Sequence, residues 1–159
     1  WDDADLLLMV EKFLTEHGYE HYEISNYARP GHQCLHNKIY WHDEEYYALG
    51  PSASGYVNGV RYKWVSNLKL YVEGAKLGEP NYEEYMVLSW EEQLSEYAIM
   101  NLRLLNEGIR RTEVEKRFSE SAWNLLLKQA EGNDFLNIEL DKITVKNWLF
   151  FNRAAEAFV

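Results

Sequence analysis

The strongest constraint on the fold is an amphipathic helix followed at once by a short strand. Apolar residues recur along the segment 2–17 at the spacing of one helical face, and Gly18 ends the segment. That face comprises Leu6, Met9, Val10, Phe13 and Leu14. The segment 19–25 is short and aromatic, which is typical of a strand, and alternation places Glu23 on a face that we expect to be solvated. The start of the chain therefore predicts an α/β unit.

Turn and cap signals organise the rest of the chain. Asn58-Gly59 between two strand-like runs predicts a hairpin, because a type I′ turn needs positive φ at both central residues. Ser89 and Glu92 form a capping box that starts a helix running to about Asn106, and the segment 78–88 before it reads as a linker. Other expected elements are helical segments at 43–47, 66–77, 112–118, 121–130 and 147–158 and strands at 135–140 and 143–145. The predicted fold class is α/β followed by a mainly α, winged-helix-like part.

Composition excludes several classes of protein. The 159 residues are 47% hydrophobic and 15% aromatic, which indicates a globular chain. A net charge of −10 argues against a phosphate-binding surface. One cysteine excludes an internal disulfide framework and suits a reducing cytoplasm, and no apolar run is long enough to span a membrane. The acidic start lacks an initiator methionine, so we expect a piece of a larger protein.

The segment 31–42 concentrates the unusual chemistry of the chain. It follows Arg29-Pro30, which interrupts regular structure, and we expect a loop at the end of a strand. Its potential ligands and stacking groups are His32, Cys34, His36, Asn37, Tyr40, Trp41 and His42.

The residues of this segment leave four interpretations open. The polar groups can satisfy loop backbone while the aromatic rings pack as core. A zinc site from His32, Cys34, His36 and His42 fits none of the usual spacings. A Cys/His nucleophile pair lacks an orienting third group. The fourth interpretation is a pocket wall for a flat, metal-bearing ligand, with His36 as axial ligand and two rings stacking on it.

A family resemblance favours the fourth interpretation. The runs YEHYEISNYARPGHQCLHNKIYW and YYALGPSASGYVNG, and later IMNLRLLNEGIRRTEVEKRFS, resemble the second half of the oxygen-independent coproporphyrinogen III oxidase-like proteins. Within that family the chain is most similar to the HemW branch of haem chaperones, whose mark is a His-Asn-x-x-Tyr-Trp motif. The motif corresponds to His36, Asn37, Tyr40 and Trp41.

The resemblance implies a fold, a site and partners. Residues 1–80 would be the carboxy-terminal part of a radical SAM (β/α) barrel, in which the polar face of the strand 19–25 would look into the lumen instead of solvent. Residues 81–159 would be the family's carboxy-terminal helical, winged-helix-like domain. His36, Asn37, Tyr40 and Trp41 would bind haem, with His36 as the metal ligand. The function implied is haem binding and delivery to an acceptor protein. The alternative is part of a coproporphyrinogen III oxidase, a radical SAM enzyme of porphyrin biosynthesis. Ser54 stands where the family usually has a histidine.

The family's cofactors would be a [4Fe–4S] cluster and S-adenosylmethionine. Three cysteines hold that cluster in the family, whereas this chain has Cys34 alone, so we expect the chain itself to lack radical enzyme activity. We also expect the strand at 19–25 to have an unpaired edge when its upstream neighbour is missing, which would favour self-association.

A winged-helix shape raises a nucleic-acid-binding alternative. The helix that would enter the groove, at about 119–131, carries Lys128 as its only basic residue beside Glu120 and Glu131. Because reading helices need several basic or amide side chains, we do not expect a nucleic-acid partner.

Overall fold

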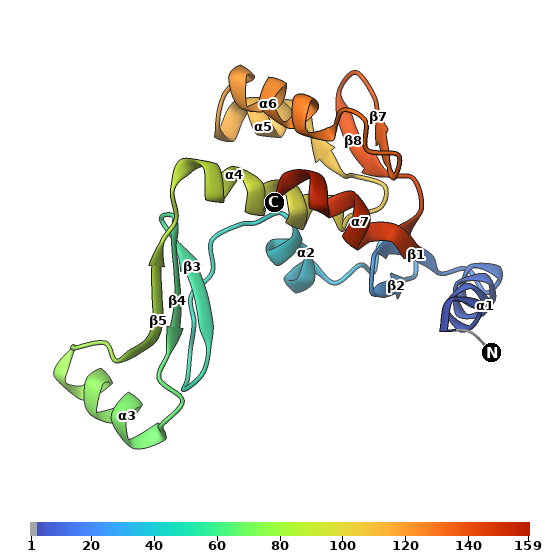
Figure 1. Cartoon of the computed structure of the whole chain (residues 1–159). Helices are drawn as coiled ribbons and strands as arrows, with labels where there is room; N and C mark the ends of the chain where they lie inside the picture. Colours follow the sequence, from blue (N-terminus) through green and yellow to red (C-terminus); the bar gives the residue numbers. More distant parts are fainter. Residues whose placement is uncertain (1–2) are drawn as a thin grey trace. The chain divides into compact units, whose positions relative to one another are not determined.

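The computed structural model describes residues 3–159, which form two compact units (Figure 1). Of the described residues, unit 1 contains 3–43 and 94–159, and unit 2 contains 44–93. Unit 1 is therefore built from two separate segments of the chain, whereas the sequence led us to expect a single boundary at residue 80. The assignment of residues 1–80 and 81–159 to family domains stays a prediction.

Helix α1 (Asp3–Glu16) confirms the predicted amphipathic helix. Asp3 and Asp5 lie in its first turn, where acidic groups interact favourably with the helix dipole. Gly18 follows with a φ of +81°, a conformation that glycine adopts without steric cost. None of the helix residues is buried within the described chain.

Strand β1 (Glu20–Glu23) pairs antiparallel with β2 (Asn26–Ala28). The prediction of a solvated face is wrong at Glu23, which is 0% exposed. The expected unpaired edge is also wrong at the end of this strand. The Leu105 N–H donates to the Tyr22 carbonyl at 3.2 Å, and the Ile24 N–H donates to the Arg103 carbonyl at 3.1 Å. This edge therefore gives no basis for self-association there.

Helix α2 (Leu35–Trp41) replaces the loop that the sequence predicted for the motif. The loop prediction is wrong because Pro30 and Gly31 interrupt the chain only before Cys34. From Leu35 onward no residue breaks a helix. The backbone bonds Lys38 N–H to Cys34 C=O (3.1 Å) and His42 N–H to Lys38 C=O (2.8 Å) close the turns.

The carboxy-terminal part of unit 1 contains most of the elements predicted for it, and one short strand that was not predicted. They are α4 (Trp90–Leu102, in unit 1 from Leu94), β6 (Ile109–Arg110), α5 (Arg111–Arg117), α6 (Glu120–Ala130), β7 (Leu136–Ile138), β8 (Lys142–Val145), η1 (Trp148–Phe150), α7 (Phe151–Ala155) and η2 (Glu156–Phe158). The strands form an antiparallel sheet in the order β6-β8-β7. Helix α4 ends at Leu102 instead of near Asn106, because the next residues hydrogen bond to β1.

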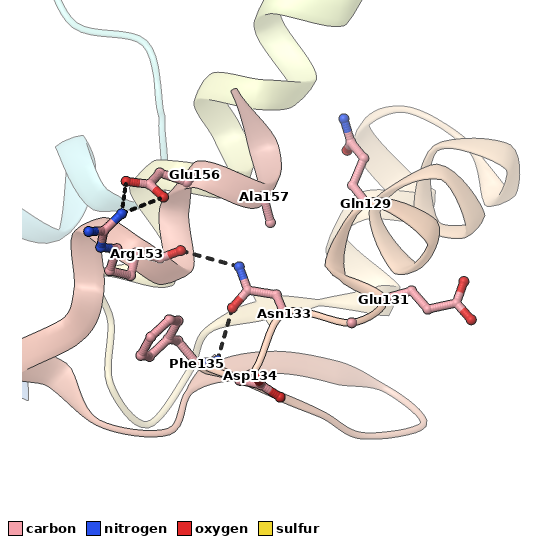
Figure 2. Close-up of a pocket in the computed structure, with 9 residues that line it drawn as sticks. Gln129, Glu131, Asn133, Asp134, Phe135, Arg153, Glu156 and Ala157 are labelled. Atoms are coloured by element: carbon pink, nitrogen blue, oxygen red, sulfur yellow. Dashed lines mark hydrogen bonds and ion pairs between the residues drawn. The ribbon is translucent and has the colours of Figure 1, made fainter.

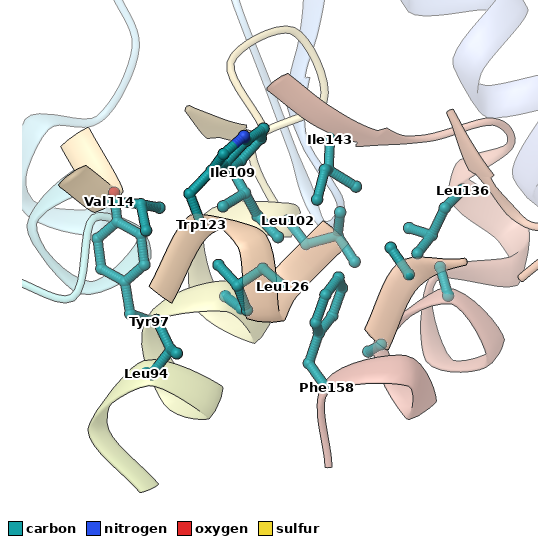
Figure 3. Packing of buried hydrophobic residues seen from close by; sticks show 14 of the residues in the cluster. Leu94, Tyr97, Leu102, Ile109, Val114, Trp123, Leu126, Leu136, Ile143 and Phe158 are labelled. Carbon is teal, nitrogen blue, oxygen red and sulfur yellow. The ribbon is translucent and has the colours of Figure 1, made fainter. Parts of the chain in front are cut away.

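The core of unit 1 lies between α4, α5, α6, the small sheet and the last helices (Figure 3). Trp123 of α6, Leu102 of α4 and Phe158 at the carboxy terminus are each at most 1% exposed. Burying apolar surface contributes about 25 cal/mol per Å², so this cluster is the main stabilising element of the unit.

Asn133 joins the turn after α6 to helix α7 (Figure 2). Its side-chain amide donates to the Arg153 carbonyl at 3.2 Å and its side-chain oxygen accepts from the Phe135 N–H at 2.9 Å. The polar pocket drawn in Figure 2 lies beside this junction and is lined by residues of 129–135 and 153–157.

Unit 2 is an antiparallel sheet in the order β3-β4-β5 with one helix. Its elements are β3 (Ser54–Val57), β4 (Val60–Trp64), α3 (Leu68–Leu77) and β5 (Tyr82–Val87). The predicted hairpin is confirmed, since Asn58 and Gly59 have φ values of +52° and +72° between β3 and β4. The capping box is confirmed by the Ser89 N–H to Glu92 bond (2.7 Å) and the Glu92 N–H to Ser89 Oγ bond (3.2 Å).

Two predictions for unit 2 are wrong. The expected linker at 78–88 is largely strand β5, which pairs with β4 from Tyr82 to Val87. The aromatic and apolar residues of β5 are compatible with a strand, and only Gly78 and Pro80, which precede it, interrupt regular structure. The expected helical turn at 43–47 is absent, because Tyr46 forms an antiparallel bridge with Tyr56. All strand pairs among the described residues are antiparallel, and these residues contain no closed barrel.

Candidate functional site on helix α2

The sequence motif lies on one short helix of unit 1. Cys34 is the N-cap residue in an extended conformation, with no side-chain capping bond, and Gly31 turns the chain before it with a φ of +76°. Helix α2 has seven residues, so its own hydrogen bonds cannot stabilise it in isolation. Contacts with the rest of unit 1 must therefore hold it.

One face of α2 is open. Leu35 is 77% exposed, and His36 and Ile39 are exposed beside it. Residues at these spacings share one side of a helix. The His36 and Tyr40 rings meet edge to face, with centroids 4.9 Å apart. Among the described residues, no hydrogen bond involves the imidazole nitrogens of His36. The face therefore presents an imidazole in an apolar surround.

The opposite face of α2 is anchored through Trp41. The Arg103 guanidinium lies 4.1 Å from the centroid of the Trp41 ring and 5.2 Å from that of Phe151. Both distances are within the range of cation–π attraction. The Trp41 Nε1 atom is buried and has no hydrogen-bond partner in the described part of the chain. This side chain is held by its ring face and not by its N–H.

Arg103 is itself fixed by β1. The Glu23 carboxylate lies 3.6 Å from Arg103 Nη2, and the same nitrogen donates to Ser25 Oγ at 3.0 Å. Glu23 accepts further hydrogen bonds from the Ser25 N–H at 3.1 Å and from the Asn26 side-chain amide. A fully buried carboxylate needs such partners, because burying an unpaired charge costs several kcal/mol.

A second anchor gathers Lys38, His42 and Arg110 around the carboxylate of Glu107. Lys38 Nζ lies 2.5 Å from Glu107 Oε1, and His42 Nε2 and Arg110 Nη2 lie 3.5 and 3.4 Å from Oε2. Burial raises the pKa of Glu107, but the hydrogen bond from Lys38 and the nearby positive charges outweigh it and lower that pKa below 4.5. Because Lys38 and His42 belong to the α2 segment, this cluster secures the same side of the helix as Trp41.

The other sequence-predicted residues are not brought together. His32 and Cys34 are exposed, whereas His42 faces Glu107 on the anchored side. Within residues 3–159 no group of three His, Cys, Asp or Glu side chains is placed to hold a metal ion, so the zinc interpretation is wrong. Asn37 is half-buried. Ser54 lies at the start of β3 in unit 2.

Sequence reasoning missed the residues that hold the motif. Glu23 contacts Arg103 from 80 residues away, Arg103 contacts Trp41 from 62 residues away, and Glu107 contacts Lys38 from 69 residues away. No local spacing pattern links these residues. The one available signal was a glutamate, Glu23, between Tyr22 and Ile24 in a strand of aromatic character. A buried carboxylate of that kind implies a basic partner elsewhere.

Comparison with known proteins shows relatives of one kind. No protein-family model matches the chain. A haem chaperone HemW from Lactococcus lactis subsp. lactis is 32% identical over 164 residues, which cover 99% of this chain and 42% of that protein. The HemW of Bacillus subtilis is 34% identical over 119 residues, covering 74% of this chain and 30% of the relative. The chain thus spans about two fifths or less of the length of these relatives.

A solved structure shows the same fold. Coproporphyrinogen III oxidase (HemN) from Escherichia coli, described as a radical SAM enzyme, matches 98% of this chain with a TM-score of 0.71 and 16% identity. The match covers 40% of that protein. At this identity the likeness concerns the fold alone. In residues 3–159 no helix is long and apolar enough to cross a membrane.

Proposed function

The chain belongs to the HemW/HemN-like family of haem chaperones and radical SAM coproporphyrinogen III oxidases, and we propose that it binds haem through helix α2 for delivery to an acceptor protein. The observation that carries this proposal is His36, an exposed imidazole between Leu35 and Ile39. A haem-binding face needs an axial nitrogen ligand and apolar contacts for the porphyrin, and this face supplies both.

Each motif residue has a proposed role. His36 ligates the iron through one ring nitrogen. Tyr40, edge-on to that ring, limits its rotation and extends the aromatic surface. The other imidazole nitrogen of a ligating histidine needs a hydrogen-bond partner that fixes its tautomer, and Asn37 or a backbone carbonyl is proposed for this role. Trp41 contributes to the site from the anchored side of α2, where it holds the helix, because Arg103 covers one face of its ring.

The family's other cofactors do not fit the residues of this chain. A [4Fe–4S] cluster is held by several thiolates, and the chain has the single exposed thiol of Cys34. Cluster and S-adenosylmethionine binding are therefore proposed only for the full-length relatives, and no catalytic step is assigned to this chain.

Architecture and location belong to the same proposal. The order of α1 and β1 supports the end of a partial (β/α) barrel. Helices α4, α5 and α6 with the sheet β6-β8-β7 support a winged-helix-like domain. The single cysteine supports a cytoplasmic protein.

The second candidate function is a part of a coproporphyrinogen III oxidase, favoured by the fold match to HemN. Porphyrinogens contain no iron, so a site built for them does not need an axial ligand. Iron dependence of binding therefore separates the two candidates.

The test compares haemin with iron-free protoporphyrin IX on the chain and on His36→Ala. We expect His36→Ala to weaken haemin binding about tenfold or more and to shift the Soret band, while protoporphyrin affinity changes little. His32→Ala is the matched control, since it removes another exposed histidine just before α2 and should leave both titrations unchanged. If His36→Ala leaves the haemin spectrum and affinity as in the parent chain, haem ligation by this residue is excluded.

A further inference from the structure

Trp41 and His36 lie on different sides of the same short helix. They are five residues apart, which corresponds to about 140° of rotation at 3.6 residues per turn. Fixing the Trp41 ring in the body of unit 1 therefore fixes the direction in which the His36 imidazole points. The helix has no side-chain cap and no buried residue of its own to do this.

The group that fixes Trp41 comes from a distant part of the chain. Arg103 follows α4 directly, and its guanidinium lies between the rings of Trp41 (4.1 Å) and Phe151 (5.2 Å). A planar guanidinium stacks on aromatic rings, whereas a lysine ammonium is a compact charge without that geometry. The side chain of Arg103 therefore suits contact with two rings.

The backbone and the guanidinium of Arg103 are held by the last residue of β1 and by the turn that follows it. Its carbonyl accepts the Ile24 N–H at 3.1 Å, and its Nη2 contacts the fully buried Glu23 and Ser25 Oγ. Residues 23–25 thus hold both the backbone and the guanidinium of Arg103 beside Trp41. We call Glu23, Arg103 and Trp41 the Arg103 clamp.

We propose that Arg103 is a positioning residue for the α2 site: by stacking on Trp41 it sets the rotation of α2 and so presents His36 to haem. The haem ligand in this inference rests on the proposed function, whereas the contacts of the Arg103 clamp do not depend on it. Arg103 does not touch the haem and acts only through Trp41. Lys38, at i−3 from Trp41 on the same side, reinforces the orientation through Glu107.

The test uses Arg103→Lys, which keeps the positive charge near Glu23 but removes the planar stacking. Hydrogen–deuterium exchange of the α2 amides reports the clamp without any ligand, and haemin titration reports its consequence. We expect the exchange of α2 to accelerate severalfold and the haemin Kd to rise about threefold to thirtyfold. The Soret position of the bound form should stay unchanged, because the iron ligand is still His36.

Two further variants separate positioning from a general loss of structure. Trp41→Leu removes the other partner of the Arg103–Trp41 contact and leaves Glu23 and Arg103 intact. It should therefore produce the same two effects. In the double variant, α2 exchange and the haemin Kd should rise no further than in either single variant, since both substitutions remove the same contact. Arg153→Lys is the matched control, because its pair with Glu156 is exposed and lies away from α2.

The outcomes distinguish this inference from the proposed function. Unchanged α2 exchange and unchanged haemin affinity in Arg103→Lys would disprove the positioning role, even if His36→Ala abolishes ligation. Additive effects of Arg103→Lys and Trp41→Leu would disprove it too. If His36→Ala has no effect on haemin while Arg103→Lys still accelerates exchange, the proposed ligand is wrong and the clamp is a structural contact only.

Discussion

Arg117 holds Asp43 at two points. Its Nη1 donates to the Asp43 backbone carbonyl at 2.7 Å, and its Nη2 lies 2.8 Å from the Asp43 carboxylate. Asp43 is only 3% exposed and has a φ of +52°, a conformation that costs a non-glycine residue about 1–2 kcal/mol. The two bonds offset this cost at the point where the chain leaves α2 and unit 1.

Replacing Asp43 with Asn tests the charge without changing the backbone preference. Asparagine tolerates positive φ as well as aspartate does, so the loss reports the ion pair. We expect Asp43→Asn to lower the free energy of unfolding by about 1–3 kcal/mol in urea denaturation. Glu156→Gln, which weakens the exposed pair with Arg153, is the control and should change stability by less than about 0.5 kcal/mol. Equal small effects of both variants would contradict this account.

Glu107 should make stability depend on pH in the acidic range. Its pKa is lowered in the folded state, so its contribution is present above the unfolded value near 4.5 and is lost as pH falls through the lower folded value. We expect Glu107→Gln to cost about 1–3 kcal/mol at pH 7, because Lys38, His42 and Arg110 lose their carboxylate.

The measurement is urea unfolding of both proteins between pH 7 and pH 3. The two stabilities should converge as pH falls below 4.5, since Glu107 of the parent chain is then increasingly neutral. A difference that stays constant across this range would mean that the ion pairs do not account for the shift.

Tyr97 should make stability depend on pH in the alkaline range. Burial raises its pKa from 10 to about 12; the charge of Arg117 lowers the pKa by a smaller amount, and that of Glu113 raises it slightly further. A raised folded pKa gives stability that is complete below pH 10 and is lost as pH rises toward 12. Between pH 9.5 and 11.5 the parent chain should lose up to about 2 kcal/mol more than Tyr97→Phe, which cannot ionise. Parallel pH profiles of the two proteins in denaturant titrations would refute this.

Gly108 and Gly132 separate backbone strain from steric overlap. Both have positive φ (+60° and +79°), but a Cβ at Gly108 would overlap the Ile143 carbonyl oxygen, whereas one at Gly132 meets nothing within 4 Å. We expect Gly132→Ala to cost about 1–2 kcal/mol from strain alone. Gly108→Ala should cost about 3 kcal/mol or more, because the backbone of β8 cannot move without breaking the β6-β8 pairing. Thermal unfolding gives both values, and equal losses would show that β8 adjusts.

Local signals in the sequence predicted the elements whose chemistry is local. The Asn58-Gly59 turn, the Ser89–Glu92 capping box and the periodicity before Gly18 each depend on residues within a few positions of one another, and each is confirmed. Strand β5 and helix α2 were not predicted, because the residues that stabilise them are distant in the sequence. β5 forms because β4 offers a partner edge, and α2 persists because Arg103 and Glu107 hold it.

The candidate site was predictable in its residues but not in its arrangement. The His-Asn-x-x-Tyr-Trp run names His36 and Trp41 as neighbours in one motif. The expected loop left the directions of the two side chains undefined, whereas the helix directs His36 outward and Trp41 toward Arg103. The sequence contains no marker for that rotation, because it depends on the contact of Arg103 with Trp41 and on the buried Glu23 side chain beside Arg103.

The division of unit 1 into two segments has a consequence for the nascent chain. Arg103 is 62 residues after Trp41, so at about 5–20 residues per second the ribosome needs roughly 3–12 s between them. During that interval the seven residues of α2 are too few to remain helical alone, while unit 2 already has its sequence complete through Gln93. The motif is therefore synthesised early and ordered late. Its imidazole acquires a defined direction only after the residues that follow α4 have emerged and closed on β1.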